Sequence, residues 1–586
     1  MSEPSKRRCL GRRRSCGTTA ASSDGVVELS HQRHTARQAA RTRLIHPAPR
    51  SLDEVLRVPM ECVHRLLRYS DWSLQPGIRA ELLQACERGI ILTTSFSGTG
   101  GVEAVAHAVM NEVANALGVK PPRVVCYSAS DNAPEARRML LGHDGPGKPR
   151  HVFGNLLDRL PANVRADLIA LQEKKLQLWK DTKLEQKEEN LTDTEVRNVQ
   201  TRLACELVAG VQEILRKTTF ERKAYCYAHR KHCFISPMSD PELDLMLWME
   251  VAGSACTAFS QAGLRAGWLH ESALIYLSWL FSIRFFSPDI LLHECVKFFP
   301  PAALAEVLND PAVQVKCDFS LTAGPEGDDD DESDMDGEMI SPVDEVDDQR
   351  GTSNTFVQEL AGPKWNTQSY VFGPTDLGIP AARARRYSIC VRSGSAVFMP
   401  GAEFGEAFFA PLISTGKIYL DVELEDSGAA DCDDFLADNL SSSDIARLEG
   451  WHLLCAKRGL CDSDFRNWKT PFAVASITQT AEWQGVGQST ANHVMPTILR
   501  RTRLWDLVGE KPIGLHTHWL IMGFAHPRVK LQSVSADVRN LCSPLSSTIP
   551  SLSLVEQRSL TGNMMHSSAF AAAFLYAIGC TSKFAS

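Results

Sequence analysis

The sequence contains no apolar run long enough to span a bilayer, so we expect no membrane partner. Its longest candidate, Phe570 to Ile578, is too short and is better explained as a buried helix. A signal-peptide pattern is also absent, and the 17 cysteines are scattered along a chain of 586 residues. That distribution excludes the dense disulfide framework of a small secreted domain and indicates a reducing compartment.

An excess of positive charge is absent as well. The formal net charge is −8, so the whole molecule is not a generic basic nucleic-acid binder, and any such surface must be local. The composition that remains is that of a packed protein, with 44% hydrophobic and 23% charged residues. The length predicts two to four domains, without indicating an oligomeric state.

Two segments have a strongly biased charge. Residues 1–50 contain the clusters Lys6-Arg7-Arg8 and Arg12-Arg13-Arg14 with few acids, which predicts a disordered basic tail. Such a tail is typical of a nuclear-localisation signal, and an organelle transit peptide is the alternative because it is also rich in arginine and poor in acids. Residues 318–352 are acidic enough to repel themselves, so we expect a disordered linker there.

The first motif with chemical meaning is a glycine-rich turn. The apolar run Ile90 to Phe96 predicts a strand, and Val102 to Ala116 predicts a helix rich in small residues. Between them lies Ser97-Gly98-Thr99-Gly100-Gly101, whose spacing is not the full dinucleotide fingerprint. Glycines let a backbone approach a ligand closely, and a helix N-terminus offers free N–H groups, so the turn is a candidate ligand loop.

Three further motifs follow along the chain. The apolar run Trp248 to Ala252 predicts a buried strand, and the small residues after it place Cys256 in a tight loop at the carboxyl end of that strand. A second apolar run ends in the carboxylate Glu294. Arg383 and Arg385 lie in a basic turn before another predicted strand, and Asn563 precedes a terminal helix rich in small residues.

In this order the motifs resemble those of the cytosine-5 DNA methyltransferase family over most of Ile90 to Gly579. The resemblance implies an α/β fold, namely the Rossmann-like sheet of an S-adenosylmethionine-dependent methyltransferase, with a helical insertion and a second, target-recognition domain. It implies S-adenosylmethionine as cofactor and DNA as partner. It also implies transfer of a methyl group to carbon 5 of cytosine through a covalent cysteine adduct, for which the base must leave the stack.

The resemblance also assigns roles to residues. Cys256 matches the nucleophile, Glu294 the carboxyl that contacts the flipped base, and Arg383 and Arg385 the arginines that steady base and phosphate. Residues expected to bind the cofactor are Phe96, Ser97, Gly98, Gly100, Gly101, Asp131 and Asn563. Asp131 stands in for the usual ribose-binding glutamate, and its alternative role is to cap the helix that follows.

Two other functions stay open. The same chemistry on RNA is one, because a base in a single-stranded loop is already accessible. A catalytically degenerate relative that binds nucleic acid is the other. Four departures from the family's usual residues favour it, namely Ala129 for glutamate, Ala255 for proline, Cys295 for asparagine and Ala381 for glutamine.

A short run of potential metal ligands lies outside these motifs. Cys226, His229, His232 and Cys233 are residue types that zinc prefers, but structural zinc sites normally combine two well-separated pairs. We therefore expect no metal there and interpret the run as a polar loop, leaving zinc as the open alternative.

The motifs and charge shifts divide the chain into segments. Leucines among many Lys and Glu residues predict a helical hairpin for 164–222, interpreted as a solvated arm without a catalytic role. The expected organisation is 1–50 tail, 51–89 N-terminal helices, 90–163 cofactor half, 164–222 helical insertion, 223–317 catalytic half, 318–352 acidic linker, 353–395 arginine motif, 396–550 target-recognition domain and 551–586 C-terminal helix.

Overall fold

The structure is a computed structural model that describes most of the chain. The described ranges are 51–68, 75–189, 192–237, 240–254, 267–297, 299–309, 364–399, 408–414, 440–469, 473–478, 495–527 and 547–584, with a few single positions besides. The predicted basic tail, the predicted acidic linker and the loop holding Ala255 and Cys256 lie outside the described residues. Contacts separate residues 1–45 from residues 46–586, and the description below concerns the second unit alone.

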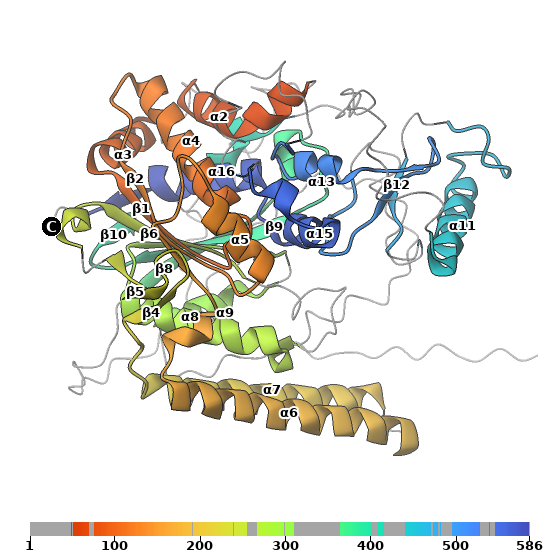
Figure 1. Ribbon diagram of the computed structural model, residues 1–586, viewed down its shortest axis with the longest axis horizontal. Coiled ribbons are helices and arrows are strands. Elements are labelled where there is room, and N and C mark those ends of the chain that lie inside the picture. The colour runs from red at the N-terminus through yellow and green to blue at the C-terminus, as the bar shows by residue number, and fades with distance from the viewer. Residues whose placement is uncertain are drawn as a thin grey trace, which may run out of the picture. The chain divides into compact units, whose positions relative to one another are not determined.

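A nine-stranded sheet with the order β5-β4-β3-β2-β1-β6-β7-β9-β8 organises the fold (Figure 1). Strands β3, β2, β1, β6 and β7 are parallel, whereas β9 runs antiparallel between β7 and β8. The arrangement confirms the expected α/β class and fits a Rossmann-like methyltransferase. The strands are β1 Ile90–Ser95, β2 Val124–Ser130, β3 His151–Phe153, β4 Lys223–Cys226, β5 Lys231–Phe234, β6 Leu247–Gly253, β7 Ile290–Val296, β8 Trp365–Phe372 and β9 Arg385–Arg392.

The strand order reverses at β1, which pairs with β2 on one side and with β6 on the other. Ser95, at the end of β1, lies opposite Ser130 of β2 and Ala252 of β6, so these strands end at one edge. Open α/β sheets bind ligands outside the carboxyl ends of their strands where the order reverses. The topology therefore places a candidate ligand crevice beyond β1 and β6.

Alternate residues along the central strands face two different cores. Ile90 and Leu92 lie in a core formed with α2, α3, α4 and α16, whereas Leu291 and Cys295 face a second core with α8 and α9. Successive side chains of a strand point to opposite faces of the sheet. Where helices cover both faces, the sequence of each strand is therefore an unbroken apolar run. The helices are α2 Leu52–Arg68, α3 Gln75–Arg88, α4 Gly101–Leu117, α8 Glu271–Phe286, α9 Pro301–Asn309 and α16 Ser567–Gly579.

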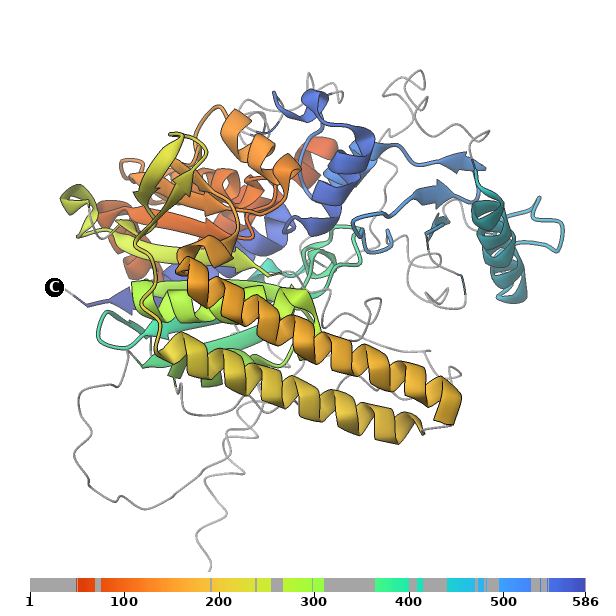
Figure 2. The ribbon, with the colours of Figure 1, turned by 60° about the horizontal axis from the view of Figure 1, so that its bottom comes forward.

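The segment expected to form a helical hairpin consists of two long helices, α6 (Ala162–Glu189) and α7 (Asp193–Arg216), which lie side by side (Figure 2). A capping box at Thr192 starts α7. The Thr192 hydroxyl accepts from the Glu195 N–H, and the Glu195 carboxylate accepts from the Thr192 N–H. Leu207 and Leu215 of α7 pack in the core beneath α8, whereas Leu184 of α6 is 58% exposed. The hairpin is therefore anchored at one end and solvated at the other.

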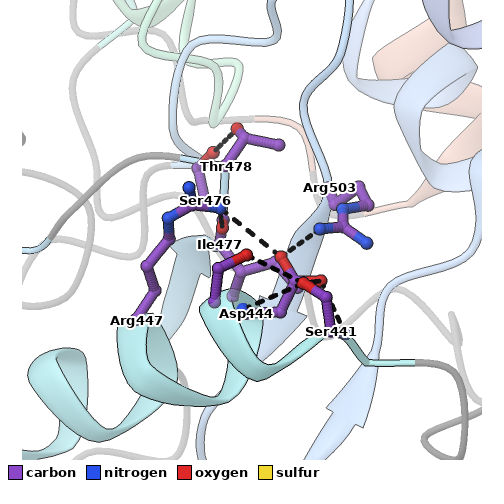
Figure 3. Close-up of polar contacts among 8 residues, drawn as sticks. Ser441, Asp444, Arg447, Ser476, Ile477, Thr478 and Arg503 are labelled. Atoms are coloured by element: carbon purple, nitrogen blue, oxygen red, sulfur yellow. Dashed lines mark hydrogen bonds and ion pairs between the residues drawn. The ribbon is translucent and has the colours of Figure 1, made fainter.

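A smaller core lies within the segment expected to recognise the target. It is built around Trp451 of α11 (Ser442–Lys457) and Trp505 of a three-stranded sheet, whose strands are β11 Val474–Ser476, β12 Leu504–Asp506 and β13 Lys511–Pro512. The buried Asp444 caps α11 through Ser441 and pairs with Arg447 and Arg503 (Figure 3). Burial acts to raise the pKa of Asp444, but the hydrogen bonds from Ser441 and Arg503 outweigh it and leave that pKa below its usual range.

The remaining described α-helices and β-strands lie outside the central sheet. They are α5 Pro134–Gly142, α13 Leu515–Ile521, α15 Leu554–Asn563, and the strand pair β10 Ala396–Phe398 and β14 Thr581–Lys583. Among the described residues, no helix combines the length and apolarity that crossing a membrane would require.

Candidate functional site

The glycine turn lies at the strand-order reversal, between β1 and α4. Gly98 has φ +57° and Gly100, which caps α4, has φ +79°, and both values belong to the left-handed region that favours glycine. A Cβ on Gly98 would find open space, with the Met564 Cα at 3.9 Å as its nearest neighbour. The loop therefore presents bare backbone toward the crevice, which suits a ligand that must approach the main chain.

Hydrogen bonds join this loop to the end of β2. The Ser97 N–H donates to the Ser130 carbonyl at 3.1 Å, and the Gly98 N–H donates to Asp131 Oδ2 at 2.8 Å. The other carboxylate oxygen of Asp131 accepts from the Ala133 N–H at 2.8 Å, directly before α5. Burial raises the pKa of Asp131, against the lowering effect of the Ala133 and Gly98 N–H groups. Each oxygen keeps a lone pair, so Asp131 braces two loops and can still accept from a ligand hydroxyl.

A buried carboxyl lies directly behind the loop. Glu103 of α4 is 1% exposed, and its Oε1 accepts from the Thr94 hydroxyl, which lies 2.6 Å from the Ser97 hydroxyl. Its Oε2 is buried without a hydrogen-bond partner among the described residues. Desolvation raises the pKa of Glu103 to about 7, despite the Thr94 bond that lowers it. Hydrogen bonds through Thr94 thus connect Ser97 of the glycine loop to the Glu103 carboxyl, whose pKa is about 7.

A second buried polar network underlies β1 and was not predicted from the sequence. Glu250 of β6 accepts from the hydroxyls of Thr93 and Ser95 and from the Trp279 indole. Arg159, itself buried, donates to the hydroxyls of Ser95, Ser130 and Ser282. One available signal was the single acid inside the apolar run Trp248 to Ala252, since a buried charge requires partners.

Strand β7 fixes the residue at which the Cys256 loop begins. Ser254, the last described residue before the loop, shares a hydrogen bond of 2.8 Å with Nε2 of the fully buried His293. The His293 ring packs against Tyr276, Trp279 and Phe299, and burial lowers its pKa to about 3. The neutral His293 imidazole therefore fixes Ser254, which lies two residues before the predicted nucleophile Cys256.

Glu294 and Arg385 meet at the same edge, as two of the predicted catalytic residues. Glu294 ends β7, Arg385 begins the antiparallel β9, and their Oε1 and Nε atoms lie 3.2 Å apart. The contact is an ion pair without hydrogen-bond geometry, between side chains that are 8% and 12% exposed. Gly253 lies opposite Glu294, and a Cβ there would come within 3.5 Å of Glu294 Oε2, so the carboxyl borders the end of β6.

Arg383 differs from Arg385 in its surroundings. It is 5% exposed and donates to the carbonyls of Ile498, Gly562 and Met564, the last at 2.7 Å. These bonds fix the turn after α15, so the contacts of Arg383 are structural, and its predicted contact with base or phosphate stays a prediction. Asn563, a predicted cofactor residue, is the last residue of α15 and is exposed.

The turn after α15 connects the two halves of the site. Met564 lies next to Gly98 of the glycine loop, and a Cβ on Gly253 would meet the Met565 side chain at 2.9 Å. Gly562 fits so tightly that an added Cβ would lie 2.2 Å from the Arg500 amide nitrogen. The C-terminal motif therefore lies between the glycine loop and the end of β6, which are more than 150 residues apart in sequence.

The departures from the family pattern that the structure describes are all buried. β2 extends to Ser130, so Ala129 lies within the strand, pairs with Thr94 and Val152 and packs in the core. Ala381 is 2% exposed and bridges to Met495. Cys295 is 1% exposed and accepts from the Ser254 hydroxyl at 3.6 Å. Ala129 therefore does not face the crevice, and among the described residues Asp131 is the acid that follows β2.

Comparison with known proteins adds little to this geometry. No protein-family model and no curated protein matches the sequence. A solved E. coli structure described as a "putative DNA modification methyltransferase encoded within prophage Cp-" aligns with 83% of this chain and 98% of its own, at 11% identity and a TM-score of 0.33. A likeness at that TM-score supports no assignment, so the fold and the site rest on the strand order and the contacts described above.

Proposed function

We propose that the chain is an S-adenosylmethionine-dependent methyltransferase that modifies carbon 5 of cytosine in DNA. One observation carries the proposal: motifs distant in sequence converge at the strand-order reversal. The bare glycine loop, the Glu294–Arg385 pair and the turn at Met564 and Met565 all border the ends of β1 and β6. The predicted nucleophile Cys256 follows two residues after Ser254, which is held at the same edge.

The residues of the glycine loop fit the cofactor. Gly98 keeps side chains away from the approach to the backbone, and Asp131 offers carboxylate lone pairs to ribose hydroxyls. Bound S-adenosylmethionine would supply an electrophilic methyl group. Phe96 follows β1, and its ring packs edge-on against Trp279, with 6.0 Å between the ring centroids. The Phe96 ring would border the space next to the bound cofactor.

The catalytic half supplies the nucleophile and the groups that stabilise the charge that develops on the base. The Cys256 thiolate adds to C6 of cytosine, which makes C5 enamine-like and able to attack an electrophile; loss of the C5 proton and departure of the thiolate then restore the ring. Glu294 would meet N3 and the exocyclic amine as charge develops on the base. Arg385 lies beside this carboxylate and restricts its position, and Arg383 acts through the backbone turn that it holds.

The test is covalent trapping with DNA that contains 5-fluorocytosine, because fluorine at C5 blocks the elimination that releases the enzyme. We expect a denaturation-resistant complex with wild-type protein and S-adenosylmethionine, and none with Cys256→Ser. Cys205→Ser is the matched control, since Cys205 lies on the helical arm α7 and should leave trapping unchanged.

The substrate arms separate the alternatives. Trapping on a single-stranded RNA probe but not on DNA would move the activity to RNA. If the wild type forms no complex on either and transfers no methyl group, the proposed catalysis is wrong and the degenerate relative is favoured.

A further inference from the structure

The hairpin β4–β5 places two cysteines on one face and a histidine on the other. Ala224 pairs with Cys233 and Tyr225 with His232, so alternation along the strands sends Cys226 and Cys233 inward and His232 outward. His232 is exposed and packs against the Tyr225 ring. The structure therefore separates His232 from the two thiols that are its neighbours in sequence.

Two other histidines complete a compact cluster with these thiols. His229 lies in the hairpin turn, where the next residue, Arg230, adopts φ +54°. His229 Nδ1 lies 3.5 Å from both Cys226 Sγ and Cys233 Sγ, and His151 Nδ1 of β3 lies 3.8 Å from Cys226 Sγ. All four atoms lie within 4.8 Å of one another. His151 is 75 residues from Cys226 in sequence, so only the fold reveals it.

The three Nδ1–Sγ distances, 3.5, 3.5 and 3.8 Å, are those of ligands around one tetrahedral ion. Zinc binds sulfur at about 2.3 Å and nitrogen at about 2.0–2.1 Å, which places tetrahedral ligand atoms roughly 3.3–3.8 Å apart. Hydrogen bonding accounts for the cluster less well, because one imidazole nitrogen carries at most one N–H and cannot donate fully to two sulfurs.

A disulfide accounts for it less well too. Cys226 and Cys233 are diagonal rather than opposite neighbours in the hairpin. Diagonal positions are typically about 7–8 Å apart, beyond the usual disulfide range of about 4.4–6.8 Å. A bridging ion spans that separation without moving the strands.

We propose that His151, Cys226, His229 and Cys233 bind a structural zinc ion. Two thiolates and two imidazoles form a ligand set that zinc prefers and that the hard cations magnesium and calcium do not. Four protein ligands leave no open position, so the ion has a structural role.

The ion would fasten the hairpin to the sheet where hydrogen bonding is sparse. β3 and β4 pair only through Phe153 and Cys226, with one further bond from the Tyr227 N–H to the Val152 carbonyl at 2.8 Å. The Tyr227 ring lies under the Arg137 guanidinium at 4.7 Å, and Arg137 donates to the Asp131 and Asn132 carbonyls. The hairpin thereby supports the turn that braces the glycine loop.

The first experiment measures metal in the full chain, purified without a polyhistidine tag. We expect about one zinc per chain after dialysis, with X-ray absorption showing two sulfur and two nitrogen neighbours at the distances above. His151→Ala and Cys226→Ser should lose that zinc, and His232→Ala, the adjacent exposed control, should keep it. A zinc-free wild type, or equal loss in His232→Ala and His151→Ala, would overturn the proposal.

The second experiment needs no variant and so does not depend on a mutant folding. Trypsin can cut after Arg230 in the hairpin turn and after Lys231 at the start of β5. A chelator should speed this cleavage at least several-fold in the wild type, and added zinc should reverse the effect. Cleavage that is indifferent to chelator and zinc would show that no ion holds the hairpin.

Discussion

At the scale of single residues, the Glu294–Arg385 pair decides how the candidate base-contacting carboxyl is aimed. Its two side chains come from antiparallel strands and are almost fully buried, so little solvent competes with the pair. A planar guanidinium constrains a carboxylate better than a flexible ammonium does. The pair therefore predicts a measurable difference between arginine and lysine at position 385.

Arg385→Lys should keep the charge and lower kcat/KM for methyl transfer by about tenfold, equivalent to about 1.4 kcal/mol of transition-state stabilisation. The neighbouring Arg386→Lys is the matched control, because Arg386 donates to the Lys297 carbonyl and does not pair with Glu294. Initial rates with saturating S-adenosylmethionine measure both. Equal rates for wild type and Arg385→Lys would show that the pair does not position the carboxyl.

Glu103 predicts a pH dependence of stability. Burial raises its pKa from the usual 4.5 to about 7, so between those values the folded state binds more protons than the unfolded state. Stability from this group is therefore greatest below pH 4.5 and falls as the pH rises to about 7, by roughly 3 kcal/mol. Glu103→Gln keeps an acceptor for Thr94 without the charge.

The melting temperature of Glu103→Gln, relative to wild type, should therefore increase from pH 5 to pH 8. Glu242→Gln is the control, since Glu242 lies at the surface with a side chain that is 78% exposed. A constant difference across that range would mean that Glu103 titrates normally.

Single residues also show where sequence reasoning succeeds. Glu294 was expected at the end of an apolar run and Arg385 in a basic turn before a strand, and the structure places them near the end of β7 and at the start of β9, because strand ends are marked by local composition. His151 could not be assigned to the Cys226 cluster, and Arg159 could not be assigned to the network around Glu250. Those contacts depend on pairing between distant segments, which the local pattern does not encode.

At the scale of elements, the β1–α4 loop depends on glycine for two different reasons. Gly100 is crowded, since a Cβ there would lie 3.1 Å from Leu140 Cδ2, so its substitution would disturb packing as well as any ligand. Gly98 borders open space, so its substitution isolates the approach to the crevice. Gly118 caps the other end of α4 with φ +69° and likewise has open space.

Gly98→Ala and Gly118→Ala should therefore lose similar stability, about 1 kcal/mol each, from the left-handed backbone alone. Only Gly98→Ala should weaken S-adenosylmethionine binding, by about tenfold, because its new methyl group faces the crevice. Calorimetric titration of both variants checks this. Unchanged affinity in Gly98→Ala would reduce the loop to a structural turn.

Element type was more accessible from sequence than element order. The leucine pattern within 164–222 indicated two helices, since the spacing of apolar residues along a helix is a local signal, and α6 and α7 occupy that segment. The position of β9 between β7 and β8 was not predicted, because an antiparallel return after a long insertion leaves no periodic signal. The small core around Trp451 also lacked a recognisable rhythm, as its strands have only two or three residues.

At the scale of the whole molecule, charge is distributed very unevenly. Residues 318–352 contain fourteen acids and one arginine, so without them the formal net charge changes from −8 to +5. The described residues that flank the long insertion are close together: the Asn309 side chain, at the end of α9, donates to the Trp365 carbonyl at 2.8 Å and accepts from the Trp365 N–H. The fold therefore does not need a long segment to connect α9 with β8.

Replacing residues 318–352 with a short Gly/Ser linker should accordingly leave the melting temperature close to wild type, because loop-closure entropy changes slowly with length. DNA affinity should be unchanged or higher at low salt, and the gain should shrink as salt screens the anionic repulsion that was removed. Fluorescence anisotropy at several salt concentrations, with a linker of equal length that keeps the acids as control, measures this. A large fall in melting temperature would show that the segment packs on the core, and a loss of affinity at low salt would show that its carboxylates assist binding.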